Sequence, residues 1–438
     1  MEFDPDTCYR ALASRDVRFD GRFFIGVRTT GIYCRPICPA RTARRENVDF
    51  YPTAAAAQEA GFRPCLRCRP EAAPDSGAWR GVSNSGHSHT VARALALIEQ
   101  GALDEAGLSL LTDKLGVGER QLRRLFAQYV GASPQAVAQT RRILLAKQLI
   151  HETRMPLTDI AFAAGFGSVR RFNEVFQQLY RRPPGALRRD IDAAAAASDH
   201  ISLLLRYRPP YHWQAMLDYL RRQAVPGLEI VREESYVRAI AQDGECGVLT
   251  VSHEPRQHAL RVGLHLPRLR ALPQLLARVR AMFDLAADME PIERQLAQDP
   301  LLAKLVPRQT GLRLPGVWDG EEIRFRQLSI PDRLEWLETR GQPLSHPAFP
   351  ALRFALPESA EPPPPDGPDR LPPVPDWQAA LLAREGKTAD LSPARMENWR
   401  PWRAYAAHHL LMAGNRDDAC GTAAPAHAPL EYALRALS

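Results

Sequence analysis

The sequence predicts a multidomain α+β protein: a small zinc-held α+β domain, an all-α domain with two helix-turn-helix units, an antiparallel-sheet α+β domain and a degraded helical C-terminal region. Three observations predict this organisation. Two close cysteine pairs lie near the N-terminus, a helical pattern repeats once in the middle, and alternating apolar stretches follow residue 200. At 438 residues the chain is too long for one ordinary core, so two to four domains are expected.

Composition and charge narrow the class of protein. A hydrophobic content of 45% with 24% charged residues is typical of globular proteins, and the net charge of +7 permits a nucleic-acid partner. No apolar run approaches a membrane span, and the acidic N-terminus MEFDPDTCYRAL does not resemble a signal peptide. With reduced thiols expected as well, the sequence predicts a cytoplasmic protein.

The two cysteine pairs are Cys34-Arg35-Pro36-Ile37-Cys38 and Cys65-Leu66-Arg67-Cys68. Two close pairs separated by a loop can bring four thiolates to one tetrahedral Zn2+. Two disulfides or free thiols are the alternatives, but each pair is too tightly spaced to bridge comfortably. The spacing therefore favours zinc.

Arginines crowd the same segment. They are Arg28, Arg35, Arg41, Arg44, Arg45, Arg63, Arg67 and Arg69. An anionic thiolate site among so many cations suits a surface that lies against a phosphate backbone. Thr29-Thr30-Gly31 could add a hydroxyl and bare backbone for a phosphate.

Around these cysteines, residues 1–75 combine short alternating stretches with a helical run at Thr53–Ala60. Such a short domain would take much of its stability from the metal. The stretch Asp75–Ser88, rich in Gly and Ser, is interpreted as a linker.

A helix-turn-helix pattern occurs twice between Thr90 and Arg189. The predicted helices are Leu108–Leu115 with Glu119–Tyr129, and Leu157–Ala164 with Ser168–Leu179, joined by a helix at about Pro134–His151. The second helix of each unit carries polar side chains that could reach a major groove: Arg120, Gln121, Arg123, Arg124, Ser168, Arg170, Arg171 and Asn173. A helical bundle with a solvated basic face is the alternative, but the repeat after two glycine-containing turns favours DNA.

An antiparallel α+β domain follows the alanine-rich connector Asp192–Asp199. Its predicted strands and helices are Ile201–Arg206, Trp213–Gln223, Leu228–Arg232, Val237–Ala241, Gly247–His253, Ala259–Leu264 and Leu272–Phe283. This segment contains no catalytic constellation. Beyond Trp318 the pattern weakens: Pro357–Pro375 is proline-rich, helical spacing returns only at Ser392–Met412, and the end from Ala413 looks loosely ordered.

The motif Arg28-Thr29-Thr30-Gly31-Ile32-Tyr33-Cys34-Arg35-Pro36-Ile37-Cys38, with Gly61-Phe62-Arg63-Pro64-Cys65-Leu66-Arg67-Cys68, resembles the N-terminal domain of Ada-type DNA-repair and response proteins. The resemblance implies a zinc site of Cys34, Cys38, Cys65 and Cys68. It also implies that Cys34 accepts a methyl group irreversibly, in a single turnover, from a methylated DNA phosphotriester. Thr30, Arg41 and Arg63 would contact DNA, whereas Pro39 stands where the family has a further arginine. The Pro-Cys-His-Arg motif for O6-alkylguanine repair is absent.

Two further resemblances complete the domain assignment. Ile160-Ala161, Gly165-Phe166, Phe172 and Phe176 resemble AraC-type DNA-binding domains, and residues 201–320 resemble the N-terminal domain of AlkA-type 3-methyladenine DNA glycosylases. The expected domains are residues 1–75, 89–190 and 200–316, with a divergent glycosylase region at 317–438. The order resembles bacterial fusions, which implies double-stranded DNA and RNA polymerase as partners and a nucleoid-associated location.

The leading hypothesis is a DNA methylphosphotriester methyltransferase joined to a transcription regulator. The alternatives are a glycosylase that excises alkylated bases, or a regulator whose zinc is only structural. The glycosylase pattern breaks at Asp319-Gly320-Glu321-Glu322, no Leu-Pro-Gly-x-Gly hairpin follows, and resemblance resumes only at Trp399–Leu410. The aspartates of interest in this stretch are Asp332, Asp376 and Asp390, none in the context that the family gives its catalytic aspartate.

Overall fold

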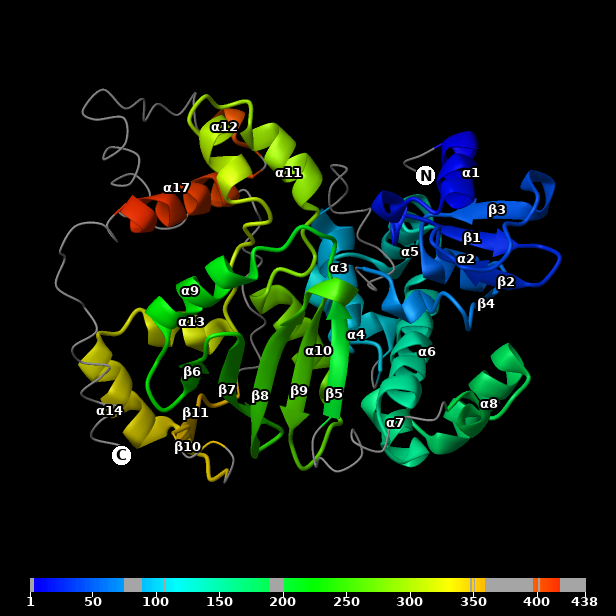
Figure 1. Cartoon of the computed structure of the whole chain (residues 1–438). Helices are drawn as coiled ribbons and strands as arrows, with labels where there is room; N and C mark the ends of the chain where they lie inside the picture. The colour runs from blue at the N-terminus through cyan, green and yellow to red at the C-terminus, as the bar shows by residue number, and fades with distance from the viewer. Residues whose placement is uncertain are drawn as a thin grey trace. The chain divides into compact units, whose positions relative to one another are not determined.

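The computed structural model describes residues 4–74, 89–104, 107–188, 201–346, 349, 351–358, 397–400 and 402–417 (Figure 1). Its contacts divide the chain into two units, residues 1–206 with 267–277 and residues 207–266 with 278–438. The predicted linker, the alanine-rich connector, nearly all of the proline-rich stretch and the end of the chain after residue 417 lie outside the described residues. In the part of the chain that the structure describes, no helix is long and apolar enough to cross a bilayer.

The first unit begins with helix α1 (Pro5–Ser14), whose amino end is capped by the Asp4 side chain. A four-stranded sheet follows, in the order β3-β1-β2-β4. Its strands are β1 (Phe24–Val27), β2 (Ile32–Cys34), β3 (Val48–Tyr51) and β4 (Arg63–Pro64). The short helix α2 (Ala54–Glu59) confirms the helical run that the sequence predicts here.

Helices follow the sheet in this unit. They are α3 (His89–Glu99), α4 (Leu108–Leu115), α5 (Glu119–Tyr129), α6 (Pro134–Glu152), α7 (Leu157–Ala163) and α8 (Val169–Tyr180). Apart from α3, each was predicted to within one residue. The Ser168 hydroxyl caps α8 by accepting from the amide of Arg171. The two helix-turn-helix units predicted from the sequence are therefore confirmed.

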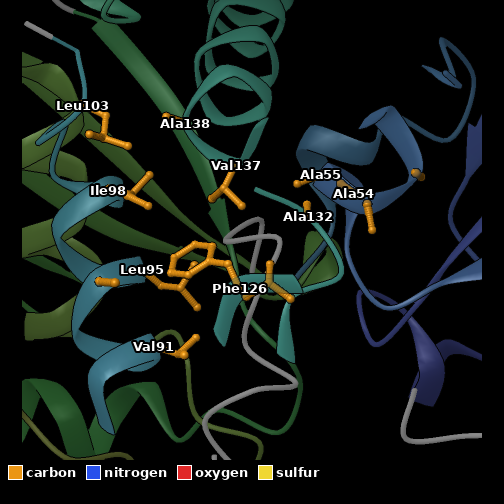
Figure 2. Packing of buried hydrophobic residues seen from close by; sticks show 14 of the residues in the cluster. Ala54, Ala55, Val91, Leu95, Ile98, Leu103, Phe126, Ala132, Val137 and Ala138 are labelled. Atoms are coloured by element: carbon orange, nitrogen blue, oxygen red, sulfur yellow. The ribbon is translucent and has the colours of Figure 1, made fainter. Parts of the chain in front are cut away.

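One apolar core is shared by the cysteine-containing segment and the first helix-turn-helix unit (Figure 2). It joins Ala54 and Ala55 of α2 to Leu95 of α3, Phe126 of α5 and Val137 of α6. Two polar links reinforce this contact: the Thr53 hydroxyl donates to the Val130 carbonyl at 3.0 Å, and Ser133 donates to Glu59 at 2.7 Å. The cysteine-containing segment keeps only a smaller core of its own, which includes Cys8, Leu12 and Phe23. Its position relative to the helices is therefore set by side-chain packing.

The second unit contains the predicted antiparallel sheet. Its strands are β6 (Glu229–Val231), β7 (Ser235–Gln242), β8 (Glu245–Glu254) and β9 (Ala259–His265), each paired antiparallel with the next. Helix α9 (Trp213–Gln223) has the predicted bounds. Strand β5 (Ile201–Arg206) also has its predicted bounds and groups with the first unit. Helix α10 (Leu272–Met282) ends one residue earlier than predicted.

Ordered structure continues past Trp318, where the sequence pattern weakens. Helices α13 (Gly320–Arg326) and α14 (Ile330–Arg340) are followed by the short strands β10 (Gln342–Pro343) and β11 (Phe354–Ala355). Phe325, Leu337 and Leu352 pack with Leu228 and Val237 of the sheet region in one core. The break in resemblance at Asp319-Gly320 is thus not a break in the fold.

A buried ion network fixes α13 to the sheet. Arg238 of β7 donates to Glu229 and Glu322 at 3.1 Å each, and Arg326 pairs with the same two carboxylates. Burial alone would raise the pKa of Glu322, but Arg238 and Arg326 lower it to about 2. No motif marks the Glu-Glu-Ile-Arg-Phe-Arg stretch in the sequence. The burial of Glu322 depends in part on Arg238, which is distant in the sequence.

Another core in this unit includes α17 (Arg403–Asp417), which overlaps the predicted Ser392–Met412 helix from residue 403 onward. Tyr405, Ala406 and Leu410 pack with Ile292 and Leu302, which belong to α11 (Met289–Leu296) and α12 (Leu302–Leu305). Trp399 is buried in the same core, and its indole donates to Asp299 at 3.1 Å. Helix α17 also carries two consecutive buried histidines, His408 and His409.

Acid is expected to detach α17. Burial lowers the pKa of His408 to about 3 and that of His409 to about 4. As the pH falls, the histidines therefore bind protons in the unfolded chain before they do so in the folded chain. Their contribution to the free energy of unfolding is fully present above pH 6.5 and is lost as the pH falls toward 4. At pH 5 the loss is on the order of 2 kcal/mol per histidine. Trp399 fluorescence during an acid titration measures this transition.

His408→Phe is the matched variant for this titration, because it removes one proton-binding group while keeping an aromatic ring against Tyr219, whose centroid lies 5.7 Å from that of His408. We expect a shallower acid transition that begins at lower pH. An unchanged transition would show that the histidines do not control it.

Candidate metal centre and nucleic-acid interface

The four predicted metal ligands converge in the first unit. Strand β2 runs parallel to β4 with Tyr33 opposite Pro64. Cys34, the last residue of β2, and Cys65, the residue after β4, therefore lie at the same end of the two strands. Cys38 and Cys68 follow in the turns after each strand, and the four sulfur atoms all lie within 4.8 Å of one another. The convergence expected from two close cysteine pairs is confirmed.

The donor set fits zinc. Four sulfur atoms at these separations can ligate one tetrahedral Zn2+, for which Zn–S bonds of about 2.3 Å are usual. All four cysteines are free of disulfides. Hydrogen bonding to Cys38, Cys65 and Cys68 raises the pKa of the Cys34 thiol. The hydrogen bond between Cys34 and Cys38 instead lowers the pKa of the Cys38 thiol to about 7. Thiols this close compete for protons, so a cation is what allows all four to be thiolates at once.

Two of the eight arginines around this centre are engaged within the protein. Arg35 is only 6% exposed, pairs with the buried Asp20, and donates to the Cys68 carbonyl at 2.9 Å. Its own amide donates to the Cys68 sulfur at 3.4 Å. Arg69 pairs with Glu71 and Glu152. These guanidinium groups hold the cysteine loop in place and are not available to a ligand.

The remaining candidates near the centre keep their polar groups at the surface. Thr30 and Arg41 are exposed, and Arg63 is partly buried on β4 next to Ile32 of β2. The Thr30 hydroxyl donates to the Val27 carbonyl at 3.3 Å within the turn from β1 to β2. Arg67 is also exposed, between Cys65 and Cys68. A cationic surface thus surrounds the metal centre even without Arg35 and Arg69.

Both predicted recognition helices present their polar residues outward. The side chains of Arg120, Gln121, Arg123 and Arg124 on α5, and those of Arg170, Arg171 and Asn173 on α8, are exposed, while Leu122, Phe126, Phe172 and Phe176 are buried. Arg170 and Arg123 form ion pairs with Glu174 and Glu119 of their own helices. Such exposed pairs are weak, and the arginines can exchange them for phosphate at little cost.

Two buried residues at the centre were missed from the sequence. The Lys147 ammonium of α6 donates to the Cys65 carbonyl at 3.0 Å and pairs with Glu71 at 2.7 Å. An isolated lysine within a helical pattern is usually interpreted as a surface residue. Only the packing of α6 against the cysteine loop reveals its position.

The candidate glycosylase aspartates form no site in the described residues. Asp332 lies in the first turn of α14, where its carboxylate accepts from the Ser329 hydroxyl at 2.6 Å. Asp376 and Asp390 lie outside the described residues.

Three family models match the chain in separate segments. Residues 7–71 match the metal-binding domain of Ada, residues 111–190 match a helix-turn-helix domain, and residues 202–319 match the AlkA N-terminal domain. The chain joins an Ada-type domain to an AlkA-type domain. The Ada-type match contains all four cysteines, so their metal is assigned as Zn2+.

Relatives share these segments. A probable bifunctional transcriptional activator/DNA repair enzyme AlkA of Mycobacterium tuberculosis is 41% identical over 330 residues, which cover 74% of this chain and 65% of the relative. The bifunctional transcriptional activator/DNA repair enzyme Ada of Escherichia coli is 37% identical over 161 residues, which cover 37% of this chain and 42% of the relative. This chain therefore spans less than two thirds of either relative's length.

A solved structure of the DNA methyl phosphotriester repair domain of E. coli Ada is 50% identical to this chain. The match covers 16% of this chain and 80% of the chain in the solved structure, with a TM-score of 0.15.

Proposed function

We propose that this chain repairs methyl phosphotriesters in DNA by transferring the methyl group to Cys34, and that it is also a transcription regulator whose DNA affinity rises after that transfer. The observation that carries the proposal is the convergence of Cys34 with three other cysteines beside exposed arginines. The names of the relatives support the pairing of repair with transcription.

The Cys34 sulfur is the nucleophile in this proposal. When bound, Zn2+ would keep the thiol deprotonated, so that no neighbouring base is needed. A sulfur lone pair attacks the methyl carbon, the methyl carbon–oxygen bond breaks, and the phosphodiester leaves as an anion. Because Cys34 then carries a thioether, the reaction is irreversible and each chain reacts once. Exposed Arg41 and partly buried Arg63 would position the neighbouring phosphates.

Charge links repair to regulation. Methylation of Cys34 removes one negative charge from a thiolate cluster that faces DNA. A less anionic cluster repels the phosphate backbone less, so affinity rises without any new contact. Helices α5 and α8 would supply sequence preference through Arg120, Gln121, Arg124, Arg170, Arg171 and Asn173, with Ser168 at the amino end of α8. Double-stranded DNA and RNA polymerase are the proposed partners, and the nucleoid of a bacterial cytoplasm is the proposed location.

The direct test is to incubate the purified chain with duplex DNA that carries labelled methyl phosphotriesters. We expect one label per chain, located by peptide mass spectrometry on Cys34. Release of free 3-methyladenine from alkylated DNA, measured beside it, would instead indicate a glycosylase. If Cys34 stays unlabelled, the result would indicate a DNA-binding regulator whose zinc is only structural.

Replacing Arg41 by alanine is expected to weaken binding to DNA of any sequence. One lost phosphate contact lowers the slope of log affinity against log salt by about one. A salt titration by fluorescence anisotropy measures this slope. Arg18→Ala is the matched control, because Arg18 is equally exposed but pairs with Asp16 at 2.7 Å. Equal slopes for the two variants would exclude Arg41 from the interface.

A further inference from the structure

A cluster of buried charges lies between the cysteine loop and helix α6. Glu71, in the short 3-10 segment Pro70–Ala72, is at its centre with a side chain only 1% exposed. Its carboxylate pairs with Lys147 at 2.7 Å and Arg69 at 3.1 Å, and it lies 3.4 Å from the ring of His151. Arg69 also forms an ion pair with Glu152 at 2.8 Å. We call these five residues the buried ion cluster.

The buried ion cluster reaches the metal centre directly. Lys147 is fully buried, and the same ammonium that pairs with Glu71 also donates to the backbone carbonyl of the ligand Cys65. Glu71 itself follows the ligand Cys68 by three residues. The second cysteine pair is therefore held at one end by a side chain that belongs to α6.

On α6, all three members lie in the last two turns. Lys147 and His151, four residues apart, share a helix face. Glu152 is the last residue of α6, and α7 begins five residues later at Leu157. Helix α6 packs against α7, and α7 packs against α8. The contacts thus extend from the cysteines to the second helix-turn-helix unit.

Apolar packing does not explain these charges. The shared core already joins α2 to the first helix-turn-helix unit. Burying charged groups costs free energy that their pairing only roughly offsets, so buried ion pairs serve geometric specificity better than stability. Burial would raise the pKa of Glu71, but Lys147, His151 and Arg69 lower it to about 2. The Glu71 carboxylate is therefore ionised at neutral pH.

We propose that the buried ion cluster couples the metal centre to the second helix-turn-helix unit, with Lys147 as a positioning residue for the ligand Cys65. An ordered zinc site fixes the Cys65 carbonyl and Glu71, and these fix the end of α6 from which α7 and α8 continue. Loss of the metal frees the cysteine loop and removes both partners of Lys147 from their places. By reciprocity, loosening α6 weakens zinc binding.

Two measurements on the full chain test this coupling. Zinc affinity is measured by competition with a chromogenic chelator, and hydrogen exchange of peptides within 140–180 is followed with and without zinc. We expect Lys147→Met to weaken zinc binding about 10- to 100-fold, the range usual for residues that support metal ligands. Removing zinc from the native chain should speed exchange at the end of α6 about five- to hundredfold.

Lys114→Met is the matched control, since Lys114 is an exposed lysine of α4. Its zinc affinity should be unchanged. The double variant Lys147→Met with Glu71→Gln avoids an unpaired buried carboxylate and should fold even where the single variant does not, while still losing zinc affinity. Native-like zinc affinity in these variants would overturn the proposal. The proposal would also be overturned if hydrogen exchange in α6 of the native chain were the same with and without zinc. That measurement needs no variant.

Neither measurement involves DNA or methyl transfer. The coupling can therefore fail while the proposed repair activity stands, and the reverse also holds.

Discussion

Replacing Cys34 by serine is expected to abolish methyl transfer and the repair-dependent rise in DNA affinity together. A serine hydroxyl stays protonated at neutral pH and is a far weaker nucleophile than a thiolate. Transfer from methyl phosphotriester DNA should fall to the rate of the reaction without protein. Labelled methyl in the protein and duplex binding before and after exposure measure the two losses.

Cys38→Ser and Cys246→Ser are the controls for that experiment. Cys38→Ser also removes a zinc ligand but keeps the proposed nucleophile, so any transfer that remains should still label Cys34. Cys246 belongs to the second unit and its substitution should change neither property. Undiminished transfer to the Cys34→Ser chain would place the acceptor elsewhere.

Replacing Arg238 by methionine is expected to destabilise the second unit by about 3–5 kcal/mol, the cost of breaking a buried ion pair from one side. Arg238 is 1% exposed, and after its loss Glu229 and Glu322 keep Arg326 as their ion-pair partner. It also removes the cation that lies 5.3 Å from the ring centroid of Trp318. Urea unfolding followed by tryptophan fluorescence measures the change.

Arg221→Met is the control for this variant, because Arg221 forms an exposed pair with Asp218 and its loss should cost less than about 1 kcal/mol. Adding Glu322→Gln to Arg238→Met should restore part of the stability, because one uncompensated carboxylate disappears. Equal effects of Arg238→Met and Arg221→Met would mean that the network does not anchor α13.

Local patterns carried most of the correct predictions. The strands of the sheet, the helices of both helix-turn-helix units and the zinc ligands each depend on spacing within a few residues. The exposed arginines of α5 and α8 follow from the same helical period that buries Phe126 and Phe172.

Local patterns did not reveal the partners of several charged residues. Arg35 and Arg69 look like phosphate contacts until Asp20, Glu71 and Glu152 are found beside them. Glu322 is buried as a carboxylate because the sheet supplies Arg238. In each case the deciding partner is distant in the sequence, and a charge has the same one-letter code whether it is solvated or buried.

The sequence by itself determined the metal-binding chemistry, because four cysteines at two short spacings leave few alternatives to zinc, and it determined which helices could face DNA. Only the tertiary structure decided that the cysteine segment and the first helix-turn-helix unit share a core, and that Lys147 of α6 supports the metal centre. The physical reason is range. Ligand spacing and helical period are set within a turn or a strand, whereas the environment of a charge is set by whatever the fold packs against it.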